Sequence, residues 1–136
     1  MKVLQFAFGS DPGNPFLPFN YTRNAVVYTG THDNDTTVGW FNAANDYERQ
    51  NLFLYLGCIS PDGINWDLIR LALSSIANQA IIPLQDLLGL GNEARMNFPG
   101  TAEGNWGWRY QSGVLTQELG DRLKTLTIRF GRDYRG

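Results

Sequence analysis

The sequence predicts an α/β fold built from parallel βα units. Three short apolar runs, at residues 2–8, 25–28 and 80–82, are continuous rather than alternating, which is typical of strands buried on both faces. Helical patterns lie between and after these runs, at residues 46–56, 66–76 and 119–130. Because long connections join the apolar runs, parallel strands with helical crossovers are the economical arrangement.

The three strands are each bounded by turn-forming residues. The first run, Lys2 to Phe8, is closed by Gly9 and the turn-rich segment 10–15. The second, Ala25 to Tyr28, is β-branched and is followed by a threonine- and glycine-rich segment, while Pro83 stops the third run, 80–82. Within the first run Phe6 and Phe8 share parity, so both should point the same way, and we expect at least one of them in the core.

The helices differ in how clearly the sequence marks them. Residues 46–56 are good helix formers without a clear apolar stripe. The next two helices have apolar residues at helical spacing: Trp66, Ile69, Leu73 and Ile76 in one, and Leu119, Leu123, Leu126 and Phe130 in the other. For the last helix Thr116 is the predicted N-cap, and Gly131 lies just past the end.

A long irregular segment, rich in Gly, Asn and Trp, runs from Gly89 to Gly113. A loop of that length is usually functional or disordered. Its aromatic residues Trp106, Trp108 and Tyr110 argue against disorder.

Length and composition bound the function classes. The chain has 136 residues, a formal net charge of −2 and 18% charged residues, which suits one domain. No run of Lys and Arg is present, which argues against nucleic acid as the main partner. Cys58 is the only cysteine, so we expect neither a disulfide nor a cysteine-based metal site. No apolar run approaches the length of a membrane span.

The densest polar cluster is the segment from Thr29 to Thr37, directly after the second strand. It holds the only histidine, His32, together with Asn34 and the carboxylates Asp33 and Asp35. On an extended backbone the two carboxylates face one way and His32 and Asn34 the other. The segment is interpreted as a solvated turn, a metal site, or a site that binds hydroxyls or does carboxylate chemistry.

A second polar cluster runs from Arg95 through Asn97, Pro99 and Thr101 to Trp106 and Arg109. Aromatic faces beside amide, hydroxyl and guanidinium donors suit a carbohydrate, because the apolar face of a pyranose stacks on a ring while its hydroxyls bond to polar groups. The alternative is that Trp106 and Trp108 are buried packing beneath the loop.

Together these segments resemble the 4-alpha-glucanotransferases (amylomaltase or disproportionating enzyme) of glycoside hydrolase family 77. The resemblance rests on residues 1–9, on Asn14-Pro-Phe-Leu-Pro18 and on Val27-Tyr-Thr-Gly-Thr-His-Asp-Asn-Asp-Thr-Thr37 with Gly39-Trp40. It continues through Ile81-Ile-Pro-Leu-Gln-Asp86, Leu90-Gly91, Arg95-Met-Asn-Phe-Pro-Gly-Thr101 and Gly104-Asn-Trp-Gly-Trp-Arg109. This ordered set covers most of the chain.

The resemblance implies a (β/α)₈ TIM barrel, of which residues 1–136 would form one partial segment, about strands six to eight, with no second domain. It implies that Asp33 stabilises the transition state and that His32 binds the sugar at the cleaved bond. The residues expected to bind substrate are His32, Asn34, Phe6, Asn97, Pro99 and Trp106. Neither a cofactor nor a metal is implied.

The chain departs from the family pattern in what it lacks. No Arg-x-Asp nucleophile motif and no Glu-Asp-Leu-Gly acid/base motif occurs, and the four glutamates stand in unrelated contexts. Phe19 stands where many relatives have His. We therefore expect the C-terminal segment of a glucanotransferase that moves alpha-1,4-glucan segments between maltooligosaccharides with retention of configuration.

Several consequences follow from this expectation. The isolated chain should be inactive, and its partners should be maltooligosaccharides or alpha-1,4-glucans and the missing N-terminal part of the same barrel, not nucleic acid or membrane. The expected location is the cytoplasm, or a plastid where a longer form carries a transit peptide. The alternative is a catalytically inactive carbohydrate-binding or structural fragment.

Overall fold

A computed structural model describes residues 1–133, so the last three residues of the predicted segment 1–136 lie outside it. Its centre is a three-stranded sheet, in the order β1 (Lys2–Val3), β2 (Val26–Tyr28) and β3 (Gln79–Ile81). Both pairings are parallel, with Val27 opposite Lys2 on one side and Ala80 on the other. This confirms the predicted parallel α/β arrangement.

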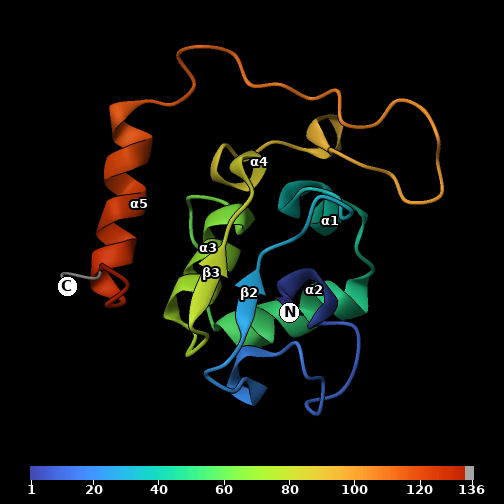
Figure 1. Cartoon of the computed structure of the whole chain (residues 1–136). Coiled ribbons are helices and arrows are strands. Elements are labelled where there is room, and N and C mark those ends of the chain that lie inside the picture. Colours follow the sequence, from blue (N-terminus) through green and yellow to red (C-terminus); the bar gives the residue numbers. More distant parts are fainter. Residues whose placement is uncertain (134–136) are drawn as a thin grey trace.

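Helices connect β2 to β3 and follow β3 (Figure 1). They are α1 (Thr37–Ala43), α2 (Asp46–Leu56), α3 (Ile64–Ser74), α4 (Leu84–Leu87) and α5 (Gln117–Arg129). Short 3₁₀ turns occur at Leu4–Phe6, Pro18–Asn20 and Asn92–Ala94. No helix in residues 1–133 is both long and apolar enough to cross a membrane.

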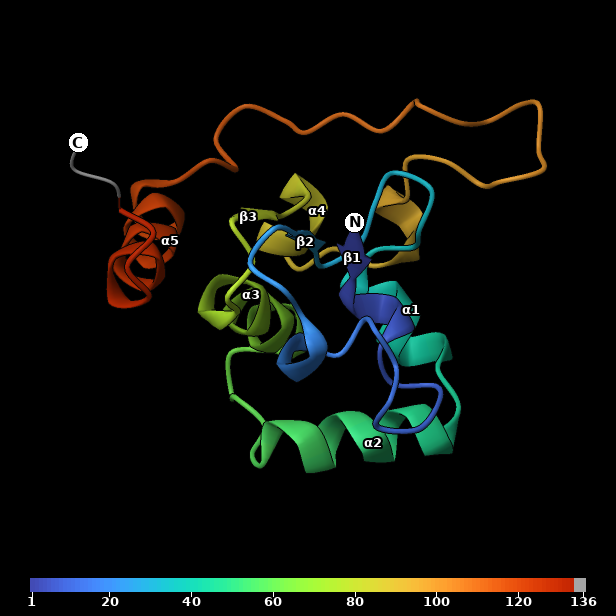
Figure 2. The same ribbon diagram turned by 60° about the horizontal axis from the view of Figure 1, so that its bottom comes forward.

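The core lies between the sheet and α2 and α3, which run beneath the strands in Figure 2. Val27 of β2, Leu52 of α2 and Leu68 of α3 are all fully buried there. A second cluster joins the other side of α3, through Trp66, Ile69 and Leu73, to the apolar stripe of α5. Helix α3 is therefore packed from two sides, while α5 is held only along one face.

The predicted strand 2–8 is wrong beyond Val3. The chain turns into a 3₁₀ helix because the Gln5 side chain is buried and its Nε2 donates to the Asp35 carbonyl oxygen at 2.8 Å. The turn breaks the parity of the two aromatic residues, so Phe8 is in the core whereas Phe6 is half-exposed. Gly30 lies beside this contact, where a Cβ would meet the Gln5 amide.

The third strand and its preceding helix also differ from prediction. Burial on both faces was expected for the strands, yet Gln79 and Ile81 of β3 are exposed. Ile76 was expected on the buried stripe of α3, but that helix ends at Ser74 and Ile76 is exposed beyond it. The short helices α1 and α4 were not predicted.

Helices α2 and α5 and the long loop agree with the sequence. Helix α2 has the predicted bounds, 46–56, and α5 begins after Thr116, whose side chain accepts a hydrogen bond from the Leu119 amide. Gly131 follows α5 with a φ of 70°, a backbone conformation that favours glycine. Between Gly89 and Gly113 the structure has only one 3₁₀ turn, so the predicted irregular loop is confirmed.

Candidate functional site

The two polar clusters found in the sequence meet at the carboxyl ends of the strands. In Figure 1, β2 and β3 both point towards α1, α4 and the long loop, which crosses above them. The segment 29–36 follows β2, and the segment 82–97 follows β3. Parallel pairing therefore brings side chains more than 60 residues apart in sequence into contact.

The base of the segment 29–37 is fixed by one buried carboxylate. Asp86, which is 1% exposed, accepts hydrogen bonds from the hydroxyls of Thr29, at 2.5 Å, and Thr37, at 2.8 Å. It also accepts one from the Thr37 amide at 2.8 Å. The residues just before and just after the loop 30–36 are thus joined to the same side chain.

Burial raises the pKa of the Asp86 carboxyl above its ordinary value, and the Asp35 charge adds to this, while the hydrogen bonds from Thr29 and Thr37 oppose it. Within residues 1–133 the hydrogen-bond donors to this carboxylate are all neutral, so it is held by dipoles rather than by a cation. Sequence reasoning did not single out Asp86, because an aspartate in an apolar stretch carries no pattern of its own.

The loop 30–36 is a turn, so the side-chain directions that hold on an extended backbone do not apply to it. Asn34 closes this turn. Its backbone amide donates to the Thr31 carbonyl oxygen, and its side-chain Oδ1 accepts from the Thr31 backbone amide at 2.9 Å and from the Thr31 hydroxyl at 2.8 Å. The predicted separation of His32 from Asp33 is therefore wrong, because the His32 Nε2 lies 3.3 Å from the Asp33 Oδ1. Asp35 instead accepts from the Thr36 amide.

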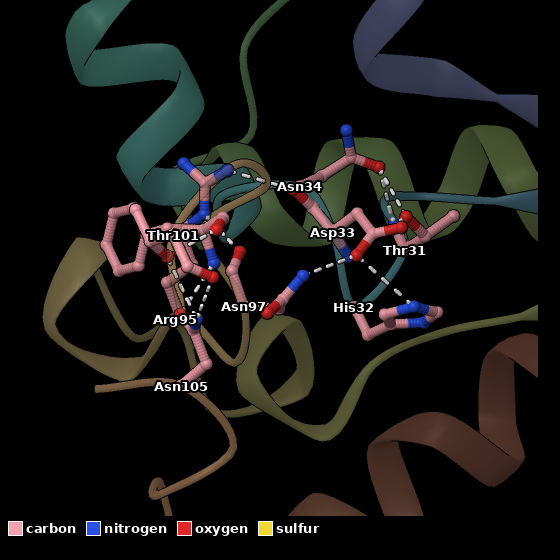
Figure 3. Close-up of polar contacts among 9 residues, drawn as sticks. Thr31, His32, Asp33, Asn34, Arg95, Asn97, Thr101 and Asn105 are labelled. Carbon is pink, nitrogen blue, oxygen red and sulfur yellow. Dashed lines mark hydrogen bonds and ion pairs between the residues drawn. The ribbon is translucent and has the colours of Figure 1, made fainter. Parts of the chain in front are cut away.

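Asp33 stands at the centre of the site (Figure 3). The Asn97 Nδ2 donates to its Oδ1 at 2.7 Å, and His32 approaches the same oxygen. The side chains of His32 and Asp33 are 57% and 51% exposed. A carboxylate with an amide and an imidazole beside it is thus fixed in place and still open to a ligand.

Trp106 forms an aromatic wall next to this carboxylate. Its indole lies 5.0 Å from the His32 ring, centre to centre, and its amide donates to the Met96 carbonyl at 2.6 Å. It is the only described non-glycine residue with a positive φ, 63°. Because Trp106 is 52% exposed, the interpretation of this ring as buried packing is not supported; Trp108 is half-buried.

His32 and Trp106 border a pocket of about 160 Å³, whereas Asp33 and Asn97 lie outside its lining. Its lining includes His32, Asp35 and Trp106, with Met96, Gln85 and Asp86 beneath. Imidazole, amide and carboxylate groups beside one exposed indole face match the needs of a hydroxyl-rich ligand with an apolar face. Within residues 1–133 no group of three or more His, Cys, Asp or Glu side chains could hold a metal ion.

Arg95 joins the two loops of the site. Its Nη2 donates to the Asp33 carbonyl oxygen at 2.9 Å and its Nε to the Asn97 carbonyl oxygen at 2.8 Å. The guanidinium lies over the Phe98 ring, 4.4 Å from its centre. The sequence pointed to the cluster around Arg95, but the contact between Arg95 and Asp33, which spans 62 residues, could not be derived from it.

The remaining predicted site residues lie less close to Asp33. The Phe6 ring packs edge-on against the Phe16 ring, with their centres 5.6 Å apart. Pro99 is exposed two residues after Asn97, in a turn closed by the hydrogen bond from the Thr101 hydroxyl to the Phe98 carbonyl. The structure thus joins Asp33 to His32 and Asn97 and places Trp106 against His32, and neither Phe6 nor Pro99 takes part in these contacts.

Comparison with known proteins gives consistent results. A family model described as 4-alpha-glucanotransferase matches residues 1–116. The chain is 62% identical over 133 residues to the 4-alpha-glucanotransferase of Synechocystis sp., a match that covers 97% of this chain and 26% of that enzyme. It is 50% identical over 135 residues to the chloroplastic/amyloplastic 4-alpha-glucanotransferase of Arabidopsis thaliana, covering 97% and 23%.

A solved structure is also similar. It is an amylomaltase from Streptococcus agalactiae in complex with acarbose, with a TM-score of 0.90 and 33% sequence identity. The match covers 96% of this chain and 26% of that one. The chain thus spans about a quarter of the length of the relatives that it matches.

Proposed function

Because the chain belongs to the 4-alpha-glucanotransferase family, glycoside hydrolase family 77, we propose that it forms part of the active site of such an enzyme. The reaction would transfer alpha-1,4-glucan segments between maltooligosaccharides. In this proposal Asp33 stabilises the transition state, and His32, Asn34, Asn97 and Trp106 bind the glucan, with Phe6 and Pro99 at the edges of the cleft.

The observation that carries the proposal is the environment of Asp33. Its carboxylate lies at the carboxyl end of a parallel sheet, where function concentrates in βα folds. It is held by Asn97 and His32 and stays half-exposed, while the His32 ring lies against the Trp106 indole. An ionised carboxylate held in this way can bond to a ring hydroxyl and strengthen that bond as positive charge develops on the sugar.

In this proposal the chain does not supply the other two carboxyl groups that a retaining transfer needs. Such a reaction uses a nucleophile and an acid/base about 5–5.5 Å apart. Of the other carboxylates at the pocket, Asp86 is 1% exposed and satisfied by Thr29 and Thr37, and Asp35 accepts from the Thr36 amide. We therefore propose that the nucleophile and the acid/base come from another part of the enzyme.

The same proposal covers the fold. Residues 1–136 would supply about strands six to eight of a (β/α)₈ barrel as one partial domain, and the rest of the barrel would be the main partner. The exposed residues Gln79 and Ile81 on β3, which has one unpaired edge in the three-stranded sheet, support a partner at this edge.

A chimeric enzyme tests the proposal. This chain would replace the matching segment of the Synechocystis enzyme, and the release of glucose from maltotriose would be measured. We expect activity in the chimera and none in the isolated chain. Asp33→Asn should lower kcat about 10²- to 10³-fold and change KM less, because the lost interaction belongs to the transition state.

The control is Asp46→Asn, which removes an exposed carboxylate at the start of α2. This change should leave turnover unaltered. A folded chimera without activity, or an Asp33→Asn chimera as active as the unsubstituted one, would contradict the proposal.

A second candidate is a fragment that binds glucan without cleaving it, which the exposed Trp106 beside polar donors favours. Calorimetric titration of the isolated chain with maltoheptaose separates the two. Binding without turnover, together with an inactive chimera, would support the binding fragment over the transferase segment.

A further inference from the structure

The loop that carries Asp33 is fixed at its base and at its tip by different side chains. At the base, Asp86 binds Thr29 and Thr37, and Gln5 donates to the Asp35 carbonyl oxygen. At the tip, Arg95 donates to the carbonyl oxygen of Asp33 itself. Of these contacts, the one at the tip acts directly on the backbone of Asp33, whose amide also donates to the Thr31 hydroxyl at 3.3 Å within the loop.

The same guanidinium also fixes the donor that reaches Asp33. The Arg95 Nε donates to the Asn97 carbonyl oxygen at 2.8 Å, and the Asn97 Nδ2 donates to the Asp33 Oδ1 at 2.7 Å. These three hydrogen bonds close a ring through Arg95, Asp33 and Asn97, seen in Figure 3. Within this ring the carboxylate cannot rotate away from Asn97 without breaking one of the bonds.

An arginine suits this position for two physical reasons. Its planar fork presents two donors at a fixed spacing, so it can hold two carbonyl oxygens from different loops at once. Its face packs on the Phe98 ring at 4.4 Å, which limits the rotation of the guanidinium. A lysine would keep the charge but would lose the fork and much of the stacking.

We propose that Arg95 is a positioning residue for the glucan-transfer reaction, setting the orientation of the Asp33 carboxylate through the two carbonyl oxygens. This inference rests on the function proposed above. Arg95 need not touch the glucan, since it acts through Asp33 and Asn97.

Arg49 provides a matched control. Its Nε donates to the Phe41 carbonyl oxygen at 3.0 Å and its Nη2 to the Asn42 carbonyl oxygen, and its guanidinium lies 5.1 Å from the centre of the Phe41 ring. It is half-buried, like Arg95, but it joins α1 to α2 rather than the two loops of the site. Arg49→Gln thus removes the same set of interactions away from Asp33.

The first test compares Arg95→Gln, Arg95→Lys and Arg49→Gln in the chimera with maltotriose, well below the thermal transition. We expect Arg95→Gln to lower kcat about 100-fold, the scale of a small misplacement of a catalytic group, with little change in KM. Arg95→Lys should recover part of this loss, and Arg49→Gln should keep full turnover. In the Asp33→Asn background, Arg95→Gln should cost almost nothing further.

The second test is made on the 136-residue chain itself and needs no enzymatic activity. His32 is the only histidine in the 136-residue chain, so its imidazole protons give one isolated set of NMR signals, shifted by the ring current of Trp106. Arg95→Gln should move these signals towards those of a free histidine, and Arg49→Gln should leave them unchanged. If the Arg95→Gln variant does not fold, the Arg95→Lys variant is measured in its place.

The outcomes separate the two proposals. An inactive chimera would contradict the proposed function. In that case the NMR signals of His32 alone would show whether Arg95 orders the loop that carries Asp33. An active chimera in which the Arg95 and Arg49 variants lose turnover equally, or lose only thermal stability, would overturn the positioning role. Additive losses for Arg95→Gln and Asp33→Asn would overturn it as well.

Discussion

Asp86 is a carboxylate buried among threonine hydroxyls and a backbone amide, and it fixes both ends of the loop that carries His32 and Asp33. Asp86→Asn keeps the size of the side chain but turns an amide group towards these donors. We expect a loss of about 1–3 kcal/mol in the free energy of unfolding, measured by urea titration. Asp46→Asn on the surface of α2 is the control and should cost much less.

The pH dependence of the same variant gives a second prediction. The pKa of Asp86 is raised by burial, so the folded chain holds this proton more tightly than the unfolded chain does. The resulting stabilisation is complete below the ordinary pKa of 3.8 and is lost as the pH rises through the raised folded-state pKa. The stability difference between the wild type and Asp86→Asn should therefore narrow as the pH rises above 3.8. A difference that widens with pH would contradict this.

Trp106 leads to a prediction about binding rather than turnover. Its half-exposed indole offers an apolar face next to His32 and Asp33. In the chimera, Trp106→Ala should raise KM for maltotriose about tenfold, roughly 1.4 kcal/mol of lost contact, and lower kcat much less than Asp33→Asn does. Trp106→Phe, which keeps an aromatic face, should recover part of the loss. A selective effect on kcat would contradict a binding role.

At the scale of single residues, the sequence could predict which segments carry the site but not how their side chains meet. His32 and Asp33 follow a predicted strand closely, so their place near a strand end was predictable, whereas the contact between their side chains was not. The contacts of Asp33 with Asn97 and Arg95 span 64 and 62 residues and depend on strand pairing. The role of Asp86 depends on burial, which nothing in its local sequence indicates.

At the scale of elements, local signals succeeded where local interactions decide the structure. Helix α5 has an apolar stripe and a threonine cap, and both were readable from spacing. The first strand failed because Gln5 makes its hydrogen bond to Asp35, 30 residues away, and this contact favours a 3₁₀ turn over an extended run. Helix α1 begins at Thr37, and its N-cap is Thr36, whose hydroxyl accepts a hydrogen bond from the Gly39 amide. This segment was considered in the sequence only for its polar chemistry, so the cap was not predicted.

The N-cap of α5 supports a prediction at this scale. Thr116→Ala removes the hydrogen bond from the Leu119 amide to the Thr116 hydroxyl and should cost about 1 kcal/mol. The loss should appear as faster hydrogen exchange in the first turn of α5, with little change in α3. Thr125→Ala, which removes a hydroxyl bonded to the Asp121 carbonyl inside the same helix, is the control. Equal effects of the two changes would argue against a capping role.

At the scale of the whole molecule, the described chain leaves much apolar surface uncovered, including Ile81 on β3, which is 46% exposed. A three-stranded parallel sheet also has two unpaired edges. We expect the isolated chain to self-associate, so that sedimentation velocity gives a mass above 15.3 kDa that rises with concentration. A monodisperse monomer with a sharp thermal transition would contradict this.

A lysine at the sheet edge tests the cause of this association. Ile81→Lys places a charge beside β3 and should reduce the average mass, because edge charges oppose strand pairing between chains. Ile128→Lys on α5, where the isoleucine is similarly exposed at 44%, is the matched control. Equal effects would indicate general apolar contact rather than pairing at the edge.

The attachment of α5 has one more consequence. The helix reaches α3 only after the long exposed loop and packs there on Trp66, Ile69 and Leu73. Just beyond the helix, the Arg132 guanidinium donates to the carbonyl oxygens of Leu73, Ser75 and Ala77. The loop therefore acts as a tether that sets the effective concentration of the helix at this surface. A single protease cut in the loop, for example after the exposed Arg109, would turn an intramolecular contact into a bimolecular one. The helix would then dissociate on dilution, although none of the side chains that hold it had changed.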